Sequence, residues 1–180
     1  MGEIKSVLAL EPLIKLLSNE NSEIRKVSIA ALGEIKSVLA LEPLIKLLSN
    51  ENSEITKASI AALGKIRSEK IVEPIIEIID NQDKMTKIKC IEILSKIKST
   101  KAVTKLVEVL SNKDENSEVR SWAAFALGEI GDEKAVQPLA NALMNENVMI
   151  VKNRSFWSLK KINTPEALET LKEYKKRKLE

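Results

Sequence analysis

The sequence predicts an all-α fold, a right-handed α-solenoid of about five stacked antiparallel helix pairs with a C-terminal capping helix. The first observation is a unit of 31 residues written twice in succession, at 2–32 and 33–63. The two copies differ only at Arg25/Thr56 and Val27/Ala58. A repeat of this length is typical of arrays in which each unit packs on its neighbours. The second observation is helical spacing of the apolar residues inside the unit.

Each unit predicts two short helices. The first, at 6–17, has four apolar residues on one face: Leu10, Leu13, Ile14 and Leu17. Pro12 lies within this pattern and should bend the helix or mark where its regular part begins. The polar turn SNENS supplies helix-capping residues. A second helix with several small residues follows at 23–35, and its predicted packed face holds Ile24, Ser28, Ala31, Leu32 and Ile35. Because neither helix can bury its apolar stripe alone, each pair must pack on the next.

The unit recurs to the end of the chain with increasing sequence differences, so we expect a single domain over 1–180. The predicted repeats are 2–36, 37–67, 68–98, 99–131 and 132–163, and a highly charged helix at 165–180 is expected to cap the array. Met1 stands in the position of Leu32, so the chain opens at the seam between two repeats. We therefore expect a monomer, or weak self-association through an uncapped N-terminal end, and the chain could be a piece of a longer array.

The composition indicates a folded chain and argues against several kinds of chemistry. Hydrophobic residues make up 44% and charged residues 31% of the sequence, which fits a helix-rich folded protein. The sequence has no histidine and one cysteine, Cys90, which we expect in the core. The usual catalytic triads and zinc sites are therefore not expected. Gly128 and Gly131 are predicted to belong to a helix end and not to a phosphate-binding loop. We predict no catalysis, no cofactor, no metal, no membrane span and a cytoplasmic location.

The later repeats carry a family resemblance. Residues 127–139, LGEIGDEKAVQPL, resemble the HEAT-like repeat of the phycobilisome lyase type (PBS lyase HEAT-like repeats). The resemblance implies a superhelix of the HEAT or armadillo type that serves as a binding scaffold. Val38 and Leu39 depart from it, because polar residues stand at the equivalent places in 127–139. A basic residue near the start of the second helix, as at Arg120, either is solvated or meets an acid in a turn, such as Glu20, Glu51, Asp83 or Glu115.

The predicted binding surface lies on the concave side of the fourth and fifth repeats, which the second helices should line. The packed positions of the second helix are predicted to be those of Val119, Ala123, Ala126, Leu127 and Ile130, and helical phase turns Ser121, Trp122, Phe125 and Glu129 away from them. In the fifth repeat Arg154 and Trp157 are turned the same way, and two lysines are expected at the edges. The predicted site residues are Trp122, Phe125, Arg154 and Trp157, with Lys89 and Lys161 at the rim. Aromatic residues with arginine are typical of binding hot spots. Alternatively, the rings pack against the next helix.

We expect a non-catalytic scaffold that binds a protein partner. The first alternative is nucleic-acid binding through the aromatic and basic C-terminal end, where KKRK occupies 175–178. The second, implied by the resemblance alone, is a phycobilin lyase-like subunit. The third is an engineered or recently duplicated repeat array without a defined function, which the near-identity of the first two units allows.

Overall fold

The computed structural model describes the backbone of residues 2–178 and the side chains of residues 8–178. Within the described part of the chain every regular element is a helix. The chain divides into two compact units, residues 1–81 and residues 82–180.

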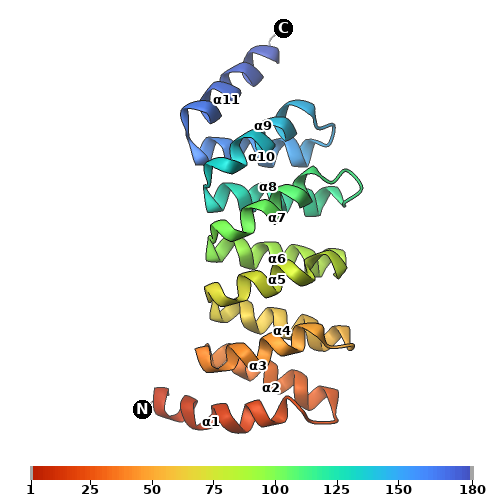
Figure 1. The fold of residues 1–180 in the computed structure, drawn as a ribbon, viewed down its shortest axis with the longest axis vertical. Coiled ribbons are helices and arrows are strands. Elements are labelled where there is room, and N and C mark those ends of the chain that lie inside the picture. Colours follow the sequence, from red (N-terminus) through yellow and green to blue (C-terminus); the bar gives the residue numbers. More distant parts are fainter. Residues whose placement is uncertain (1, 179–180) are drawn as a thin grey trace. The chain divides into compact units, whose positions relative to one another are not determined.

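The first unit, coloured red to yellow in Figure 1, contains the first two predicted repeats and the first helix of the third. Its α-helices are α1 (Gly2–Leu16), α2 (Ser22–Ile35), α3 (Leu41–Lys46), α4 (Ser53–Ile66) and α5 (Val72–Ile78). Short 3-10 helices adjoin them at η1 (Val38–Ala40), η2 (Leu47–Ser49), η3 (Glu69–Ile71) and η4 (Ile79–Asn81). The second helices α2 and α4 pack along each other, and α3 packs against α4.

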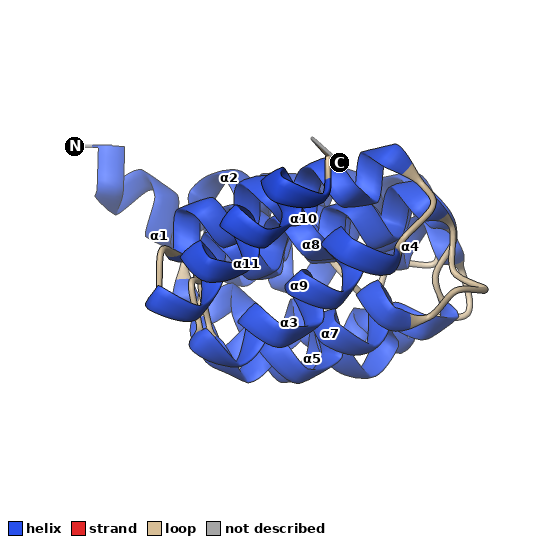
Figure 2. Cartoon of the chain, turned by 90° about the horizontal axis from the view of Figure 1, so that it is seen from above, coloured by secondary structure: helices blue, strands red, loops and turns tan. Residues whose placement is uncertain are grey.

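The second unit contains the remaining repeats and the closing helix. Its α-helices are α6 (Lys84–Ile97), α7 (Val103–Ser111), α8 (Ser117–Ile130), α9 (Val136–Asn145), α10 (Met149–Ile162) and α11 (Pro165–Arg177), with 3-10 helices η5 (Thr100–Ala102) and η6 (Glu133–Ala135). Helix α8 packs between α6 and α10, while α7 contacts α9. Figure 2 shows α7 and α9 on one side and α8 and α10 on the other. Helix α11 packs on α9 and α10.

Proline marks the start of the regular first helix in the later repeats. Pro43, Pro74 and Pro138 are each the third residue of their α-helix and follow a 3-10 turn. An N–H in the first helical turn has no partner within the helix, so a proline there removes nothing. In α1 the helix instead continues through Pro12. The predicted role of the proline as a start signal therefore holds in three repeats.

The polar turns cap the second helices as predicted. The side chains of Asn21, Asn52 and Asn116 each accept a hydrogen bond from the backbone N–H two residues further on, at 2.8, 3.0 and 3.0 Å. At the other end, the helices stop at a residue in the left-handed conformation, which is Lys36 in α2 and Gly131 in α8. An asparagine cap thus begins the helix and a left-handed residue ends it.

Two glycines inside the second helices let neighbouring repeats approach closely. A Cβ atom added at Gly33 would lie 2.8 Å from the Cα of Ala62, and one added at Gly128 would lie 2.5 Å from the Oγ of Ser158. Sequence reasoning assigned both glycines of the 128–131 segment to the helix end. Gly131, at φ 78°, does end the helix, whereas Gly128 is a helix-contact residue.

The core follows the predicted packed positions of the second helix, with two corrections. Val119, Ala123 and Leu127 are fully buried, as expected. Cys90 is also buried, and burial raises the pKa of its thiol to about 12. Ser121, predicted to turn away from the core, is buried instead and donates a hydrogen bond to the carbonyl of Glu118 at 2.8 Å. Ile24, assigned to the packed face, is 40% exposed.

The structure confirms the all-α repeat architecture of antiparallel helix pairs with a closing helix. The single domain over 1–180 stays a prediction, as does self-association through the N-terminal end, since the side chains of residues 1–7 lie outside the described residues. Residues 179–180 of the expected capping helix lie outside them too. Among the described residues, no helix has both the length and the apolar character needed to cross a membrane.

Candidate functional site

All five aromatic residues of the chain lie in the second unit, and four of them lie on α8 and α10. Trp122 and Phe125, three residues apart on α8, are neighbours on one helix face. Their ring centroids are 5.5 Å apart at an interplanar angle of 87°, an edge-to-face contact. Both rings are half-buried. Each ring therefore keeps part of its surface available above the helix.

Arg154 of α10 reaches across to these rings. Its guanidinium carbon lies 5.5 Å from the ring centroid of Trp122 and 5.0 Å from that of Phe125. Both distances are within the range of a cation–π contact. The arginine is held by two rings of the neighbouring helix, so its planar donor fork has limited freedom.

Trp157 is the most exposed of the predicted aromatic residues, with 60% of its surface accessible. Its ring and that of Phe156 form an edge-to-face pair with centroids 5.6 Å apart, and the ring of Phe156 in turn lies 6.1 Å from that of Tyr174 of α11. Sequence reasoning did not include Phe156. Its position directly before Trp157, in a chain with so few aromatic residues, was the available signal. The ring of Trp157 is thus supported on one side and open on the other.

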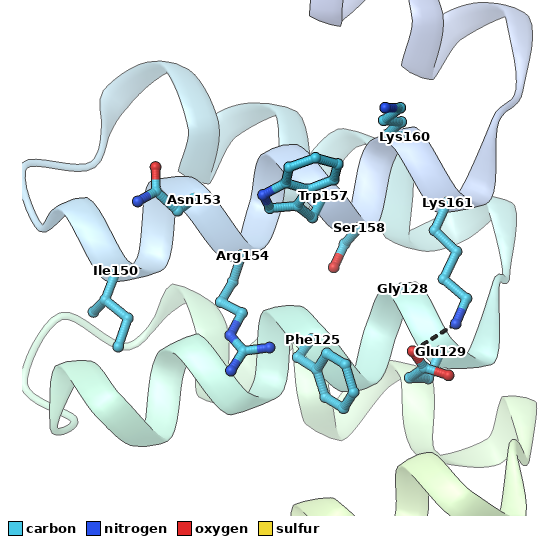
Figure 3. Close-up of a pocket in the computed structure, with 10 residues that line it drawn as sticks. All are labelled: Phe125, Gly128, Glu129, Ile150, Asn153, Arg154, Trp157, Ser158, Lys160 and Lys161. Atoms are coloured by element: carbon cyan, nitrogen blue, oxygen red, sulfur yellow. Dashed lines mark hydrogen bonds and ion pairs between the residues drawn. The ribbon is translucent and has the colours of Figure 1, made fainter.

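A cavity of about 630 Å³ lies between α8 and α10, and Figure 3 shows ten residues that line it. Small residues bring the helices together beneath it: Gly128 meets Ser158, whose hydroxyl donates to the carbonyl of Ala124 at 2.7 Å. Large side chains, including Phe125 and Trp157, line the same cavity. The cavity exists because small residues lie where the helices touch and large ones lie to each side.

The rim of the cavity is basic. Lys161 lines it and pairs with Glu129 across the helices at 2.5 Å. The ammonium of Lys160 lies 4.9 Å from the ring centroid of Trp157. Lys89, also predicted at the rim, pairs instead with Glu92 on its own helix at 2.9 Å and is not among the residues that line the cavity.

The structure therefore brings together four of the predicted site residues and one of the two predicted rim lysines. We use the name aromatic surface for Trp122, Phe125, Arg154 and Trp157. A second cavity of about 400 Å³ adjoins the first, because Phe125 and Glu129 line both. The second cavity also includes Trp122. All these residues belong to the second unit.

A buried ion network, whose residues line neither of the two cavities, links the fourth and fifth repeats. Glu146, in the turn before α10, is buried and pairs with Arg120 and with Lys113, the latter at 2.6 Å. Its carboxylate also accepts hydrogen bonds from the backbone N–H groups of Asn147 and Val148. The Lys113 hydrogen bond, then those from Arg120 and the backbone, outweigh the burial and lower the pKa of Glu146 to about 2.

The basic residue near the start of the second helix meets an acid in α6 and in α8. Lys87 pairs with Glu115, an acid in the turn of the next repeat, at 2.5 Å, and Arg120 meets Glu146 in the same way. Glu115 was among the expected acids, whereas Glu146 was not. The pairing runs from one repeat to the next, so it joins repeats within the unit.

The sequence has no histidine, so Cys90 and the acidic side chains are the candidate metal ligands and nucleophiles. Among the described residues, no three histidine, cysteine, aspartate or glutamate side chains lie close enough together to hold a metal ion. The buried thiol of Cys90, with its raised pKa, is not a reactive thiolate at neutral pH.

Comparisons with solved structures support the fold. The structure resembles a chain in the complex of CpcE and CpcF of phycocyanin lyase from Nostoc sp. PCC7120, with a TM-score of 0.71 and 20% identity. The likeness covers 89% of this chain and 67% of that one. It also resembles an engineered protein, with a TM-score of 0.64, 21% identity and coverage of 92% and 85%. A designed armadillo repeat protein matches with a TM-score of 0.61, 19% identity and coverage of 92% and 87%.

At these identities the likenesses show the fold alone. No curated protein matches the sequence. The family model for HEAT repeats matches residues 1–62, 41–115 and 105–178, which together span nearly the whole chain. The repeat length, the helix pairs and this match agree, and the chain belongs to the HEAT repeat family.

Proposed function

We propose that this HEAT repeat scaffold binds a protein partner through the aromatic surface of its second unit, on the side of the array that the second helices line and that is expected to be concave. HEAT and armadillo repeats generally form interaction scaffolds, whose extended helix layers offer a binding face. In this chain, only the second unit has aromatic residues on that face. The proposal assigns the scaffold no catalytic step.

One observation carries the proposal: Trp157 is 60% exposed beside a cavity of about 630 Å³. An exposed tryptophan contributes little to folding, because most of its surface stays in water. Tryptophan and arginine are the residue types enriched in binding hot spots, where truncation costs about 2 kcal/mol or more. The size of the cavity is within the range of ligand-binding pockets.

The test is affinity capture from extracts of the cells that make this chain, with three immobilised proteins. They are the unaltered chain, Trp157→Ala and the control Met85→Ala, whose side chain is 68% exposed on α6 of the same unit. We expect one or more proteins to be retained by the unaltered chain and by the control but lost with Trp157→Ala. Equal capture by all three would contradict the proposal. Circular dichroism of each variant shows that the helices are intact.

Nucleic acid is the alternative partner. The last turn of α11 carries the exposed residues Lys175 and Lys176, together with Arg177, which pairs with Glu173 at 2.5 Å. Phosphate binding by such a group falls steeply with salt. Nuclease treatment of the extract, and titration of the chain into labelled single-stranded RNA and duplex DNA, separate the two partners. Loss of all capture after nuclease treatment would favour the alternative.

The phycobilin lyase-like alternative has no residue that supports it here, and the engineered or recently duplicated array stays a prediction. Likeness to the lyase complex is a likeness of fold, so a phycobilin lyase-like activity is not proposed. A cytoplasmic location stays a prediction.

A further inference from the structure

We infer that the occupant of the aromatic surface is an acidic peptide segment, with a carboxylate on Arg154 and a neighbouring apolar side chain in the cavity beside Trp157. This inference rests on the proposed function and adds the chemistry of the partner. It follows from the charge of the two adjoining cavities, from the way Arg154 is held and from the shape of the cavity floor.

The charge around the two cavities is unbalanced. Their lining contains five basic residues, Lys96, Lys98, Arg154, Lys160 and Lys161, against two acidic residues, Glu92 and Glu129. A surface with this excess attracts an anionic partner and disfavours a basic one.

Both acids are already neutralised from within the unit. Glu92 pairs with Lys96 and with Lys89, and these hydrogen bonds lower the pKa of its carboxyl, so it stays ionised and paired. Glu129 pairs with Lys161. Among the residues that the structure describes, no carboxylate pairs with Arg154 or Lys160. The charge left to attract a partner is therefore positive.

Arg154 lies against two rings, and among the described residues it has no carboxylate partner. Its guanidinium carbon is 5.5 Å from the ring centroid of Trp122 and 5.0 Å from that of Phe125. A guanidinium held in this way can still offer a pair of N–H donors along its edge, the arrangement that matches a carboxylate. Since the rings already restrict the side chain, ordering it on binding costs less.

Each of the three rings already has a cation of the chain beside it. Arg154 lies over Trp122 and Phe125, and Lys160 lies over Trp157. A basic or methylated lysine side chain would have to displace these charges and enter a positive surface. An anionic partner meets no such conflict.

The walls of the cavity between α8 and α10 suit an apolar side chain of the partner. Figure 3 shows Phe125 and Trp157 on facing helices, with Gly128 and Ser158 between them and Ile150 near the start of α10. The hydroxyl of Ser158 is already bonded to the carbonyl of Ala124, so the floor offers little hydrogen bonding. A leucine, isoleucine or phenylalanine side chain would displace water from these apolar walls.

The probes are short fluorescein-labelled synthetic peptides, in matched sets, measured by fluorescence polarisation. One set places a leucine or phenylalanine among aspartates and glutamates. The second replaces every acid with its amide, the third replaces the apolar anchor with alanine, and the fourth carries phosphoserine in place of the acids. We expect the first set to bind, and the amide and alanine sets to bind on the order of tenfold more weakly.

Variants of the full chain then assign the contact. Arg154→Lys keeps the charge but removes the donor fork, and we expect it to weaken the acidic peptides on the order of tenfold. The control Lys134→Gln removes an exposed charge of η6 outside the cavities and should change binding less than about twofold.

Four results would overturn the inference: no peptide binds, the amide set binds as well as the acidic set, only the phosphoserine set binds, or Lys134→Gln and Arg154→Lys weaken binding equally. The proposed function would still stand if proteins captured from the extract are lost with Trp157→Ala. It would fail separately if that capture showed no dependence on Trp157, even where acidic peptides bind.

Discussion

Two pairs of second helices, α2 with α4 and α8 with α10, can be compared position by position. In the first unit Gly33 lies against Ala62, and Lys65 pairs with Glu34 at 2.5 Å. In the second unit Gly128 lies against Ser158, and Lys161 pairs with Glu129 at the same distance. We use the name frame for this close glycine contact and the lysine–glutamate pair beside it.

The faces built on the two frames differ. The four positions that hold Trp122, Phe125, Arg154 and Trp157 in the second unit hold Val27, Ala30, Ala58 and Ala61 in the first. Three of these first-unit side chains are exposed: Val27, Ala30 and Ala61. The frame does not need the aromatic side chains, because the first unit has the same frame with small residues. The aromatic surface is therefore an addition to the repeat, and this difference is the reason to read it as functional.

The largest predicted effect concerns the buried pair of Glu146 and Arg120, which has no counterpart among the described contacts of the first unit. Glu146→Gln should lower the free energy of unfolding by about 3–5 kcal/mol, because it leaves Arg120 buried without its charge partner. Chemical denaturation followed by circular dichroism measures the loss. The matched control is Glu51→Gln at the equivalent position of the first unit, where the side chain is exposed and the change should be within about 0.5 kcal/mol.

The same residue predicts a pH dependence. Because the pKa of Glu146 falls from an ordinary 4.5 to about 2 in the folded chain, its contribution is complete above pH 4.5 and is lost as pH falls toward 2. The stability difference between the unaltered chain and Glu146→Gln should shrink over that interval. A difference that stays constant would show that the carboxylate is not held ionised by this network.

The frame itself can be tested in both units. Gly33→Ala and Gly128→Ala should each cost about 1–3 kcal/mol, because the added methyl meets the neighbouring helix. Hydrogen exchange should rise in α2 and α4 for the first variant and in α8 and α10 for the second. If either substitution were tolerated while the other was not, the two frames would differ and the comparison would weaken.

Grafting the aromatic surface sharpens the comparison further. The substitutions Val27→Trp, Ala30→Phe, Ala58→Arg and Ala61→Trp give the first unit the face of the second. With an acidic peptide that binds the unaltered chain once, calorimetry should then report a second site with an affinity within about tenfold of the first. A stably folded graft that binds only once would mean that further residues of the second unit are required.

A smaller effect is predicted at the ends of the second helices. Lys36 and Arg67 end α2 and α4 in the left-handed conformation, where Gly131 ends α8. Replacing Lys36 or Arg67 with glycine should stabilise the chain by about 0.5–1 kcal/mol, and Gly131→Lys should cost a similar amount. Thermal unfolding of the three variants measures these changes. A loss of stability in Lys36→Gly would show that its side chain makes a contact worth more than the backbone strain.

Much of this fold could be predicted because the repeat supplies it several times over. The helix pairs, the asparagine caps and the buried leucine positions follow from spacing and local chemistry, which a single sequence displays directly. The grouping of Trp122 with Phe125 followed from helical phase, and the approach of Arg154 and Trp157 followed from the repeat register.

Contacts between repeats were harder to predict. The partner of Arg120 is Glu146, an acid of the next turn, and nothing local in the sequence selects it over neighbouring acids. Lys89 bonds to Glu92 on its own helix, since a flexible ammonium can turn to the nearest carboxylate. Gly128 looked like part of a helix stop because a glycine that ends a helix and one that admits a neighbouring helix have the same sequence signal.

The most direct test of the distinction between frame and surface compares two residues of α10. Trp157 is 60% exposed, whereas Leu159, two residues further on, is fully buried. Chemical denaturation should show that Trp157→Ala costs less than about 1 kcal/mol and that Leu159→Ala costs about 2–5 kcal/mol. Equal losses for the two variants would show that Trp157 is part of the core, and would contradict a surface built for a partner.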